Sequence, residues 1–578
     1  MSKTSMSAKA ALKKSIEDAV NIATKNSLLP EVENLNFIIE EPADKKNGDL
    51  STNVSMANSK FFKMPPRKSA EIIVDNLKLD ERYFDKCEIA GPGFINFYYN
   101  KNFYIGVLRD IENEKEHYGE SNYGQNQKIN IEFVSANPTG PMHMGNARGG
   151  ALGDCLASVL DKAGYDVSRE FYVNDAGNQI EKFACSLEAR YLQLFDSSIP
   201  FPEDGYKGED IIDHAKAYKE QYGDFLVDKD SEKRKKVLVD FALPKNIDKM
   251  QSDMKKYRIN YDKWFFESVL HESGDIKRVI ETLKEKGLTY EQDGALWYKN
   301  KDVCTNRLLN EGKTPEYIEK LELKDDVLIR TNGNPTYFAS DIAYHKDKFD
   351  RGFDRLIDVW GADHHGHVMR MKGAMDAIGY DGDKLDVVLM QLVKLMQDGK
   401  EVTMSKRSGK AIQLGDLLEE VPVDSARFIF NTKEANSQMN FDLDQAISQD
   451  NDNPVYYVQY AHARICSILR NLEAENILPR ITTDEELSLL VKDEEIELIS
   501  HLSAFDEEII SASKDYDPTK ITRYVTTLAT LFHKFYNSCR VKGEDEKLLQ
   551  ARLTLIISVK TVIKNVLDMF SITCPEKM

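Results

Sequence analysis

The sequence of 578 residues has no run of about 18 apolar residues, the length that a membrane-spanning helix needs. It also has no CxxC pair. Its seven cysteines stand singly along the chain, so neither a zinc cluster nor a disulfide framework is indicated. A scattered, odd set of thiols is typical of a reducing cytosol, and the lysine-containing start lacks the apolar core of a secretory signal. These absences predict a cytoplasmic protein, with an N-terminal transit peptide as the alternative.

Two common nucleotide-binding motifs, GxxxxGK[ST] and GxGxxG, are absent as well. Positive charge is in deficit, with 77 Lys and Arg against 96 Asp and Glu, which gives a net charge of -19 and argues against a nucleic-acid partner. The charge is segregated, however. Residues 481–517 hold twelve acidic and two basic side chains, whereas residues 521–542 hold four basic and no acidic ones. Because steering depends on the local field, a basic face for RNA stays open.

The hydrophobic pattern divides the chain into three parts. Residues 1–118 mix helical and strand-like segments and predict a separate N-terminal α/β domain. Residues 119–420 alternate strands with helices, beginning with a strand, helix and strand that predict a βαβ unit and hence a parallel sheet. Within them, residues from about 185 to 290 are charged and helix-like, which indicates an insertion. Residues 421–578 keep i, i+3, i+4 spacing and predict an all-α bundle of about five helices.

One loop has the features of a phosphate-binding site. In SANPTGPMHMGNARGG, a strand leads through prolines and glycines into the N-terminus of a helix. Free N–H groups and the helix dipole at such an end bind phosphate, and His143 and Asn146 add two further donors. Taken alone, a loop of this kind is more often a structural turn between a strand and a helix.

Two further stretches carry suitable side chains. VTMSKRSGK, residues 402–410, gathers Lys406, Arg407 and Lys410 into a cation cluster that fits a polyphosphate, although basic loops are usually solvated surface. GADHHGH, residues 361–367, follows an apolar strand, at the edge where open α/β sheets bind ligands. Its Asp and His side chains also leave a metal site conceivable, but no further ligand set stands at a readable spacing.

Together these stretches resemble the class I aminoacyl-tRNA synthetases. His143-Met144-Gly145-Asn146 stands where that class has HIGH, and Thr403 to Arg407 stands where it has KMSKS. Asn146 replaces the last His and Thr403 the first Lys. The longer stretches are similar to arginyl-tRNA synthetases of bacterial type, in family order: IEFVSANPTGPMHMGNARGGALGD, REFYVNDAGNQI, TYFASDIAYH, DVWGADHHGH, DSARF, NPVYYVQYAHAR and CPEKM.

The resemblance implies an α/β fold with a Rossmann-like parallel-sheet catalytic domain. It also implies that the N-terminal domain is an additional tRNA-binding domain and that the C-terminal all-α bundle binds the anticodon. The activity implied is ATP-dependent ligation of L-arginine to tRNA(Arg) through an arginyl-adenylate, with release of AMP and pyrophosphate. ATP enters with Mg²⁺, zinc is not used, tRNA binds before arginine is activated, and the enzyme is a cytoplasmic monomer.

The resemblance also assigns site residues. The implied catalytic residues are His143, Asn146 and Lys406. The implied ATP-binding residues are His143, Gly145, Asn146, Gly361, Asp363, His367, Met404, Ser405 and Lys406. The implied tRNA-binding residues are Phe94 and Asn96 at the tRNA elbow, and Tyr457, Tyr460, Arg464 and the terminal Met578 at the anticodon.

Arginine makes its own demands, because its guanidinium is always charged and carries five N–H donors. The resemblance points to Glu132, Asn137, His143, Tyr337 and Asp341. Tyr337 and Asp341 stand four residues apart, so on a helix they share one face, and they are assigned to the guanidinium end. Glu132 and Asn137 are assigned to the α-amino end or its surroundings.

Two alternatives remain at this point. A class I synthetase of another type, such as the cysteinyl type, requires zinc-binding cysteines that the sequence lacks and has no N-terminal domain of this kind. A catalytically silent relative that only binds RNA or a partner is the second alternative. Retention of His143, Lys406, Glu132 and Asp341 argues against it.

Overall fold

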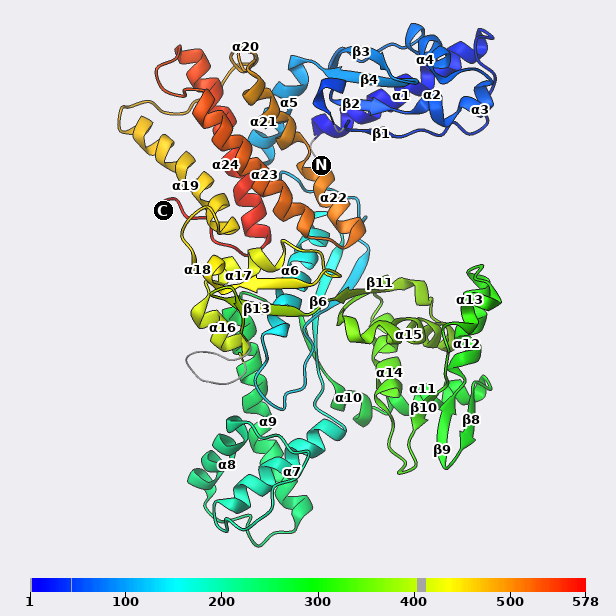
Figure 1. Cartoon of the computed structure of the whole chain (residues 1–578), viewed down its shortest axis with the longest axis vertical. Helices are drawn as coiled ribbons and strands as arrows, with labels where there is room; N and C mark the ends of the chain where they lie inside the picture. The colour runs from blue at the N-terminus through cyan, green and yellow to red at the C-terminus, as the bar shows by residue number, and fades with distance from the viewer. Residues whose placement is uncertain (1–2, 43, 403–411) are drawn as a thin grey trace.

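The computed structural model describes residues 3–42, 44–402 and 412–578 (Figure 1). At its centre lies a five-stranded sheet of order β12-β11-β5-β6-β7, in which every neighbouring pair is parallel. The strands are β5 (Lys128–Glu132), β6 (Asp166–Val173), β7 (Lys263–Phe266), β11 (Arg355–Gly361) and β12 (Leu385–Met390). The apolar runs RLIDVW and DVVLM form two of them, as expected for strands covered on both faces. The predicted Rossmann-like parallel sheet is confirmed.

Helix α6 (Gly145–Lys162) connects β5 to β6 and carries the HMGN motif at its N-terminus. It packs very close to the sheet at Gly153, where a Cβ would come within 2.2 Å of Phe133 Cγ. The helix stops at Gly164, whose φ of +92° suits glycine. Because α6 runs back along the sheet, its N-terminus lies at the edge where β5 ends.

The insertion forms a small helical body of its own (Figure 1). Its helices α7 (Asn178–Gln193), α8 (Glu209–Tyr222) and α9 (Ser231–Lys256) enclose a separate core that includes Phe183, Tyr191 and Leu238. The predicted range of about 185 to 290 also contains β7, which belongs to the catalytic sheet and pairs with β6. Two helices follow it, α10 (Glu267–Glu272) and α11 (Asp275–Glu285).

Between β7 and β12 the chain also builds a second, antiparallel sheet of order β10-β9-β8. The segments GALWYK and DDVLIRT continue the alternation of strands and helices in the sequence, which predicts strands of the parallel sheet, but they form strands of this second sheet. The elements of this stretch are β8 (Thr289–Gln292), β9 (Ala295–Tyr298), α12 (Asn300–Asn310), α13 (Pro315–Glu319), β10 (Asp326–Ile329), α14 (Tyr337–Asp350) and α15 (His365–Ile378).

The N-terminal part contains an antiparallel sheet of order β1-β2-β4-β3. The pattern of CEIAGPGFINFYYN predicts one strand with a bend, but the structure has two antiparallel strands joined by a turn, with Gly91 and Gly93 at positive φ. The pattern of DLSTNVSMANSKFF predicts one helix. The stretch instead forms a strand and two short helices, because the Asn58 side chain donates to Asn36 O and Val54 O. The elements are α1 (Lys3–Lys25), β1 (Ile39–Glu40), β2 (Leu50–Thr52), α2 (Val54–Ala57), α3 (Ser59–Phe62), α4 (Pro66–Asp75), β3 (Phe84–Ala90), β4 (Phe94–Tyr99) and α5 (Lys101–Glu114).

The C-terminal part is helical, as predicted, with one exception. Strand β15 (Met439–Asp442) pairs in parallel with β13 (Val393–Gln397), which also pairs with β14 (Lys400–Glu401). The helices are α16 (Leu414–Glu420), α17 (Val423–Phe430), α18 (Leu443–Ile447), α19 (Pro454–Glu473), α20 (Asp484–Leu487), α21 (Asp493–Ser503), α22 (Phe505–Asp515), α23 (Thr519–Ser538) and α24 (Glu546–Met569).

The bundle and the N-terminal part share one hydrophobic core, which joins residues such as Leu12, Val107 and Leu567. Helix α5 packs against α21 and α24 (Figure 1), and Tyr118 donates to Leu502 O at 2.9 Å. In the part of the chain that the structure describes, no helix has the length and apolar character that crossing a membrane requires.

Candidate active site

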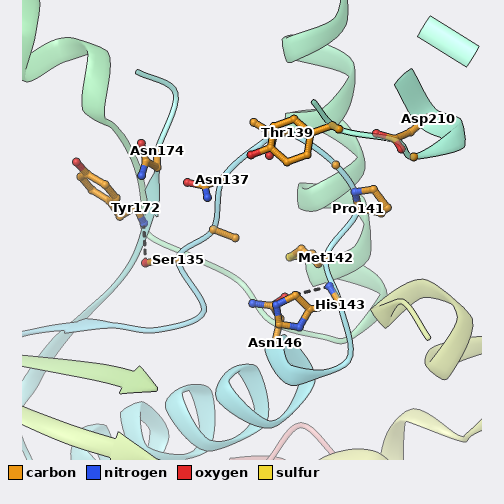
Figure 2. A pocket seen from close by; sticks show the side chains of 14 residues that line it. Ser135, Asn137, Thr139, Pro141, Met142, His143, Asn146, Tyr172, Asn174 and Asp210 are labelled. Carbon is orange, nitrogen blue, oxygen red and sulfur yellow. Dashed lines mark hydrogen bonds between the residues drawn. The ribbon is translucent and has the colours of Figure 1, made fainter. Parts of the chain in front are cut away.

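The HMGN motif forms a tight turn at the start of α6 (Figure 2). The Gly145 N–H donates to His143 Nδ1 at 3.2 Å, and the His143 N–H donates to Asn146 Oδ1 at 3.1 Å. A Cβ on Gly145 would come within 2.9 Å of His143 Cε1, so glycine is needed there. Burial lowers the pKa of His143, so the ring is neutral. Because Nδ1 accepts a hydrogen bond, Nε2 carries the proton and serves as a donor.

A cavity of about 530 Å³ opens above this turn (Figure 2). It brings together three of the predicted residues, Asn137, His143 and Asn146. Other residues of the same loop, from Ser135 to Met142, line it as well, and the opposite wall comes from the end of β6 and from the insertion, with Tyr172, Asn174, Tyr206 and Asp210. The insertion therefore forms one wall of the cavity, which sequence reasoning did not predict.

The residues after β11 lie at the same edge of the sheet as the HMGN turn. Strands β5 and β11 are parallel neighbours, with Glu132 opposite Asp358. Gly361 ends β11, and the exposed Asp363 follows it. His367 Nε2 lies 3.0 Å from Asp341 Oδ2, so a residue predicted for ATP contacts one predicted for arginine.

Met404, Ser405 and Lys406 lie outside the described residues, as do Thr403 and Arg407. The chain directly after them is bound to the HMGN loop. Met144 N donates to Ile412 O at 3.2 Å, and Leu414 N donates to Met142 O at 2.9 Å. The roles of the residues in this second motif stay predictions.

A second cavity, of about 560 Å³, contains Tyr337. Two carboxylates that sequence reasoning did not predict, Glu181 and Glu267, line it together with Tyr337. Glu267 is buried at the start of α10. Glu267 directly follows the short strand β7. Identification of this strand from the sequence would have placed Glu267 at the end of a sheet strand.

Tyr172, which lines the first cavity, lies among three carboxylates. Burial raises the pKa of Tyr172 strongly, and the charges of Glu267, Asp341 and Glu132 raise it further. These carboxylates come from α10, α14 and β5 and converge on one ring. Glu132 is balanced by Lys348, so Glu267 and Asp341 are the carboxylates near Tyr172 that would favour a cationic ligand.

Glu132 does not line either cavity. It is 7% exposed, and both carboxylate oxygens have partners. Lys348 Nζ donates to Oε2 at 2.6 Å and Ser135 Oγ donates to Oε1 at 2.7 Å. Lys348 shares one face of α14 with Asp341 and His345, but that spacing gives no sign that the lysine is buried.

Among residues 3–42, 44–402 and 412–578, no group of three or more His, Cys, Asp or Glu side chains is arranged to hold a metal ion. The absence of zinc from the working enzyme stays a prediction.

Three family models match the sequence in order along the chain. The arginyl tRNA synthetase N-terminal domain matches residues 8–99, the catalytic domain of class I (R) tRNA synthetases matches residues 108–466, and the DALR anticodon-binding domain matches residues 458–578. The second model alone spans more than half of the chain. The chain belongs to the arginyl-tRNA synthetase family.

Individual relatives agree with this family. The sequence is 54% identical to arginine–tRNA ligase of Caldanaerobacter subterraneus subsp. tengcongensis over 572 residues, 99% of both chains. It is 52% identical to that of Acetivibrio thermocellus over 566 residues, 97% of both chains. The solved Thermus thermophilus arginyl-tRNA synthetase superposes with a TM-score of 0.73 at 21% identity, covering 98% of this chain and 100% of that one. This likeness shows the fold, and the predicted fold class is confirmed.

In this arginyl-tRNA synthetase, the residues predicted to read the anticodon gather on α19. The Arg464 guanidinium lies 4.5 Å from the ring centre of Tyr460 and 5.0 Å from that of Tyr536, and it donates to Tyr460 Oη at 2.7 Å. Tyr457 lies about one helical turn before Tyr460, and its hydroxyl donates to Thr530 Oγ1 at 3.2 Å. Met578 lines a cavity of about 310 Å³ that also includes Tyr456 and Gln459 of α19.

The two residues predicted for the tRNA elbow are placed differently from each other. Phe94, at the start of β4, is half-buried. Asn96 is only 4% exposed, and its side-chain oxygen accepts from Ser51 Oγ at 2.8 Å. Its side chain is therefore bound within the sheet, which disagrees with the expectation that it faces RNA.

Proposed function

We propose that this arginyl-tRNA synthetase attaches L-arginine to tRNA(Arg) at the expense of ATP, through an arginyl-adenylate. The observation that supports arginine is the convergence of Glu267, Asp341 and Glu132 on Tyr172, beside the HMGN turn. A guanidinium adds a positive charge beside Glu267 and Asp341, whereas an uncharged side chain supplies none. The expected selectivity is therefore against neutral amino acids above all.

In the first step, a carboxylate oxygen of arginine attacks the α-phosphorus of ATP, and the bond from that phosphorus to the pyrophosphate oxygen breaks. Arginyl-adenylate and pyrophosphate are the products. His143 Nε2–H, the Asn146 amide and the N–H groups at the start of α6 stabilise charge on the phosphate oxygens. Lys406 is assigned to the pyrophosphate that leaves. Mg²⁺ enters with ATP as part of the substrate. Gly145, Gly361, Asp363, His367, Met404 and Ser405 are assigned to ATP.

Arginine spans both cavities in this assignment. Tyr337 and Asp341 bind the guanidinium end, and Asn137 binds the α-amino end, with Glu132 in its surroundings. Glu267 adds a carboxylate to the second cavity. In the second step, the 2′-hydroxyl of the terminal adenosine attacks the arginyl carbonyl carbon and AMP leaves.

The assignment extends to the domains. Residues 1–118 contact the tRNA elbow, with Phe94 on that side, residues 119–420 hold the catalytic site, and residues 421–578 read the anticodon through Tyr457, Tyr460, Arg464 and Met578. The enzyme works in the cytoplasm as a monomer.

ATP–pyrophosphate exchange with each amino acid in turn, with and without tRNA, tests the proposal. Among the amino acids, only arginine should support exchange, and it should do so only when tRNA is present. Labelled arginine should then be transferred to the tRNA. His143→Ala should lower kcat about 10²–10³-fold, because it removes a donor to developing charge. His117→Ala, far from the site in the N-terminal part, is the control. Tight tRNA binding without any charging would instead identify a binding protein.

A further inference from the structure

The turn between β5 and Asn137 has an unusual backbone. Val134 has φ +73° and Ser135 has φ +33°, and neither is glycine. A left-handed conformation is especially unfavourable for a β-branched residue such as Val134. A turn of this kind persists only where surrounding groups hold it. It also decides where Asn137 lies, because Asn137 is only two residues farther along and lines the first cavity.

Ser135 provides the holding contacts. Its hydroxyl donates to Glu132 Oε1 at 2.7 Å and accepts from the Tyr172 N–H at 3.1 Å. Ala136, the next residue, forms an isolated bridge with Val173. The turn is therefore bound to the end of β5 on one side and to β6 on the other.

Glu132 is in turn held by Lys348, whose side chain is fully buried. The ammonium of Lys348 lies 2.6 Å from Glu132 Oε2 and 2.9 Å from Asp358 Oδ1. Asp358 Oδ2 lies 2.7 Å from His345 Nε2, and His345 Nδ1 lies 2.7 Å from Asp341 O. A buried charge flanked by two opposite charges has little freedom to move, so the position of Glu132 is fixed.

We propose that Glu132 and Lys348 are positioning residues for the arginine site: Lys348 fixes Glu132, Glu132 fixes Ser135, and Ser135 holds the strained turn that presents Asn137 to arginine. The inference rests on the proposed function, since it concerns the same site. Helix α14 then serves arginine twice. Tyr337 at its start lines the second cavity, and Asp341, one turn later, contacts His367. Lys348, two turns beyond Asp341, holds Glu132.

A double-mutant cycle between Glu132→Gln and Ser135→Ala tests this chain of contacts. Each change should raise the arginine KM about tenfold, with the ATP KM nearly unchanged. Glu132→Gln also removes a buried partner of Lys348 and should lower the thermal midpoint, whereas Ser135→Ala should leave it nearly unchanged. The double variant should show the same tenfold rise, because both changes break one chain of contacts. If Glu132 instead binds arginine directly, Ser135→Ala should have little effect and the two effects should multiply, which would overturn the proposal.

Two further variants complete the test. Lys348→Met alone leaves two buried carboxylates unpaired and risks misfolding. Lys348→Met/Asp358→Asn removes one charge of each sign and should raise the arginine KM to the same extent as Ser135→Ala. An unchanged KM would remove Lys348 from the chain of contacts. Ser158→Ala is the control. It removes a hydroxyl on α6 that accepts a hydrogen bond from Arg169 of β6. Wild-type exchange that does not depend on arginine would refute the proposed function itself, whatever the variants do.

Discussion

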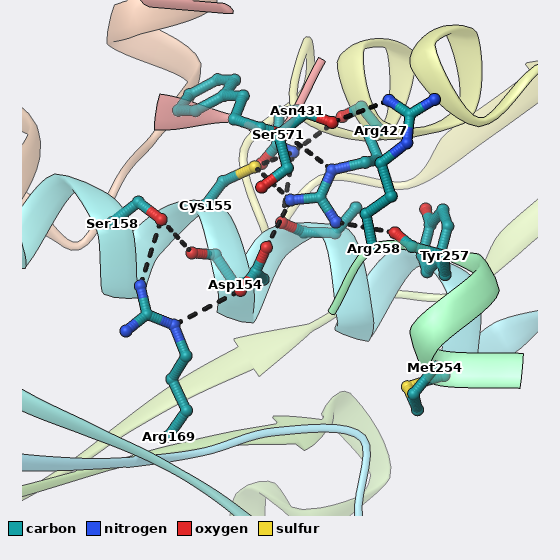
Figure 3. A network of polar contacts seen from close by, with 12 residues as sticks. Asp154, Cys155, Ser158, Arg169, Met254, Tyr257, Arg258, Arg427, Asn431 and Ser571 are labelled. Atoms are coloured by element: carbon teal, nitrogen blue, oxygen red, sulfur yellow. Dashed lines mark hydrogen bonds and ion pairs between the residues drawn. The ribbon is translucent and has the colours of Figure 1, made fainter. Parts of the chain in front are cut away.

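Arg427 of α17 donates a hydrogen bond to the carboxylate of Asp154 in α6, the helix that carries the HMGN turn (Figure 3). The same guanidinium donates from Nε to Phe570 O at 2.6 Å and from Nη1 to Tyr257 O at 3.0 Å. Phe570 directly follows α24, and Tyr257 directly follows α9. One buried side chain thus joins the catalytic helix to the end of the C-terminal bundle.

Replacement of Arg427 should be strongly destabilising. Arg427→Met leaves two carbonyls without a donor in the interior and leaves Asp154 with Arg169 as its remaining cationic partner, at 3.3 Å. Each unsatisfied buried group costs about 1–3 kcal/mol. We expect a thermal midpoint several degrees lower, measured by circular dichroism. Arg82→Met is the matched control, because Arg82 pairs with Asp80 on the surface, with 74% of its side chain exposed. Equal shifts for the two variants would contradict the role given to Arg427.

Asp341→Asn should weaken the preference for a charged substrate. The variant keeps the shape of the side chain and the contact to His367, but removes one of the three carboxylates around Tyr172. A hydrogen bond to a charged group contributes about 1.5–3 kcal/mol, so the arginine KM should rise about 10–100-fold. Pyrophosphate exchange in which citrulline competes with arginine measures this preference, because citrulline is neutral and nearly isosteric with arginine.

Asp347→Asn is the control on the same helix, since Asp347 pairs with Arg351 instead of facing the cavities. An arginine KM that rises equally in both variants would show a general effect on α14 rather than a lost contact to the guanidinium.

The catalytic strands were predictable because buried parallel strands leave continuous apolar runs in the sequence. Strands β7 and β15 were missed, because four residues are too few to show a period. They exist through pairing with distant strands, such as Phe171 with Trp264 and Leu395 with Phe441. Their positions are a tertiary property.

The site was predictable where the family motifs carry it, as at His143 and Asn146. Lys348 was not, because a lysine on a helix is ordinarily exposed. Its burial depends on Glu132, 216 residues away in the sequence. Asn96 shows the opposite error, since its place beside a tRNA-binding motif gave no sign of its hydrogen bond to Ser51.

Arg464→Gln should weaken tRNA binding and its dependence on salt. Arg464 lies between the rings of Tyr460 and Tyr536, where a cation meets stacking surfaces. Loss of one phosphate contact lowers the slope of log Kd against log salt by about 0.9. Filter binding at several salt concentrations between roughly 50 and 200 mM gives the slope of log Kd against log salt.

Lys534→Gln is the control for Arg464. Lys534 lies on the basic helix α23 but pairs with Glu497 at 2.7 Å, so its charge is already balanced. We expect a smaller loss of affinity and a smaller change in slope. A larger effect from Lys534 would place the RNA on α23 rather than on α19.

The C-terminal bundle should lose stability in acid through His533. Burial and the charge of Arg464 lower the pKa of His533 to about 4, whereas an unfolded histidine titrates near about 6.5. The unfolded chain therefore takes up a proton below pH 6.5 that the folded chain resists. The stabilisation is complete above pH 6.5 and is lost as the pH falls towards 4. The thermal midpoint of His533→Asn should decline less over this window. His117→Asn, at an exposed histidine, should follow the wild type, and identical curves for all three proteins would refute the effect.

During synthesis, Glu132 is made well before its buried partner Lys348. With 216 residues between them, and synthesis at roughly 5–20 residues per second, roughly ten to forty seconds pass before the partner of Glu132 is made. During that interval the strained turn at Val134 has no buried charge behind it. The loop with the HMGN motif is thus translated early, whereas the buried partner of Glu132 follows only once α14 has emerged from the ribosome.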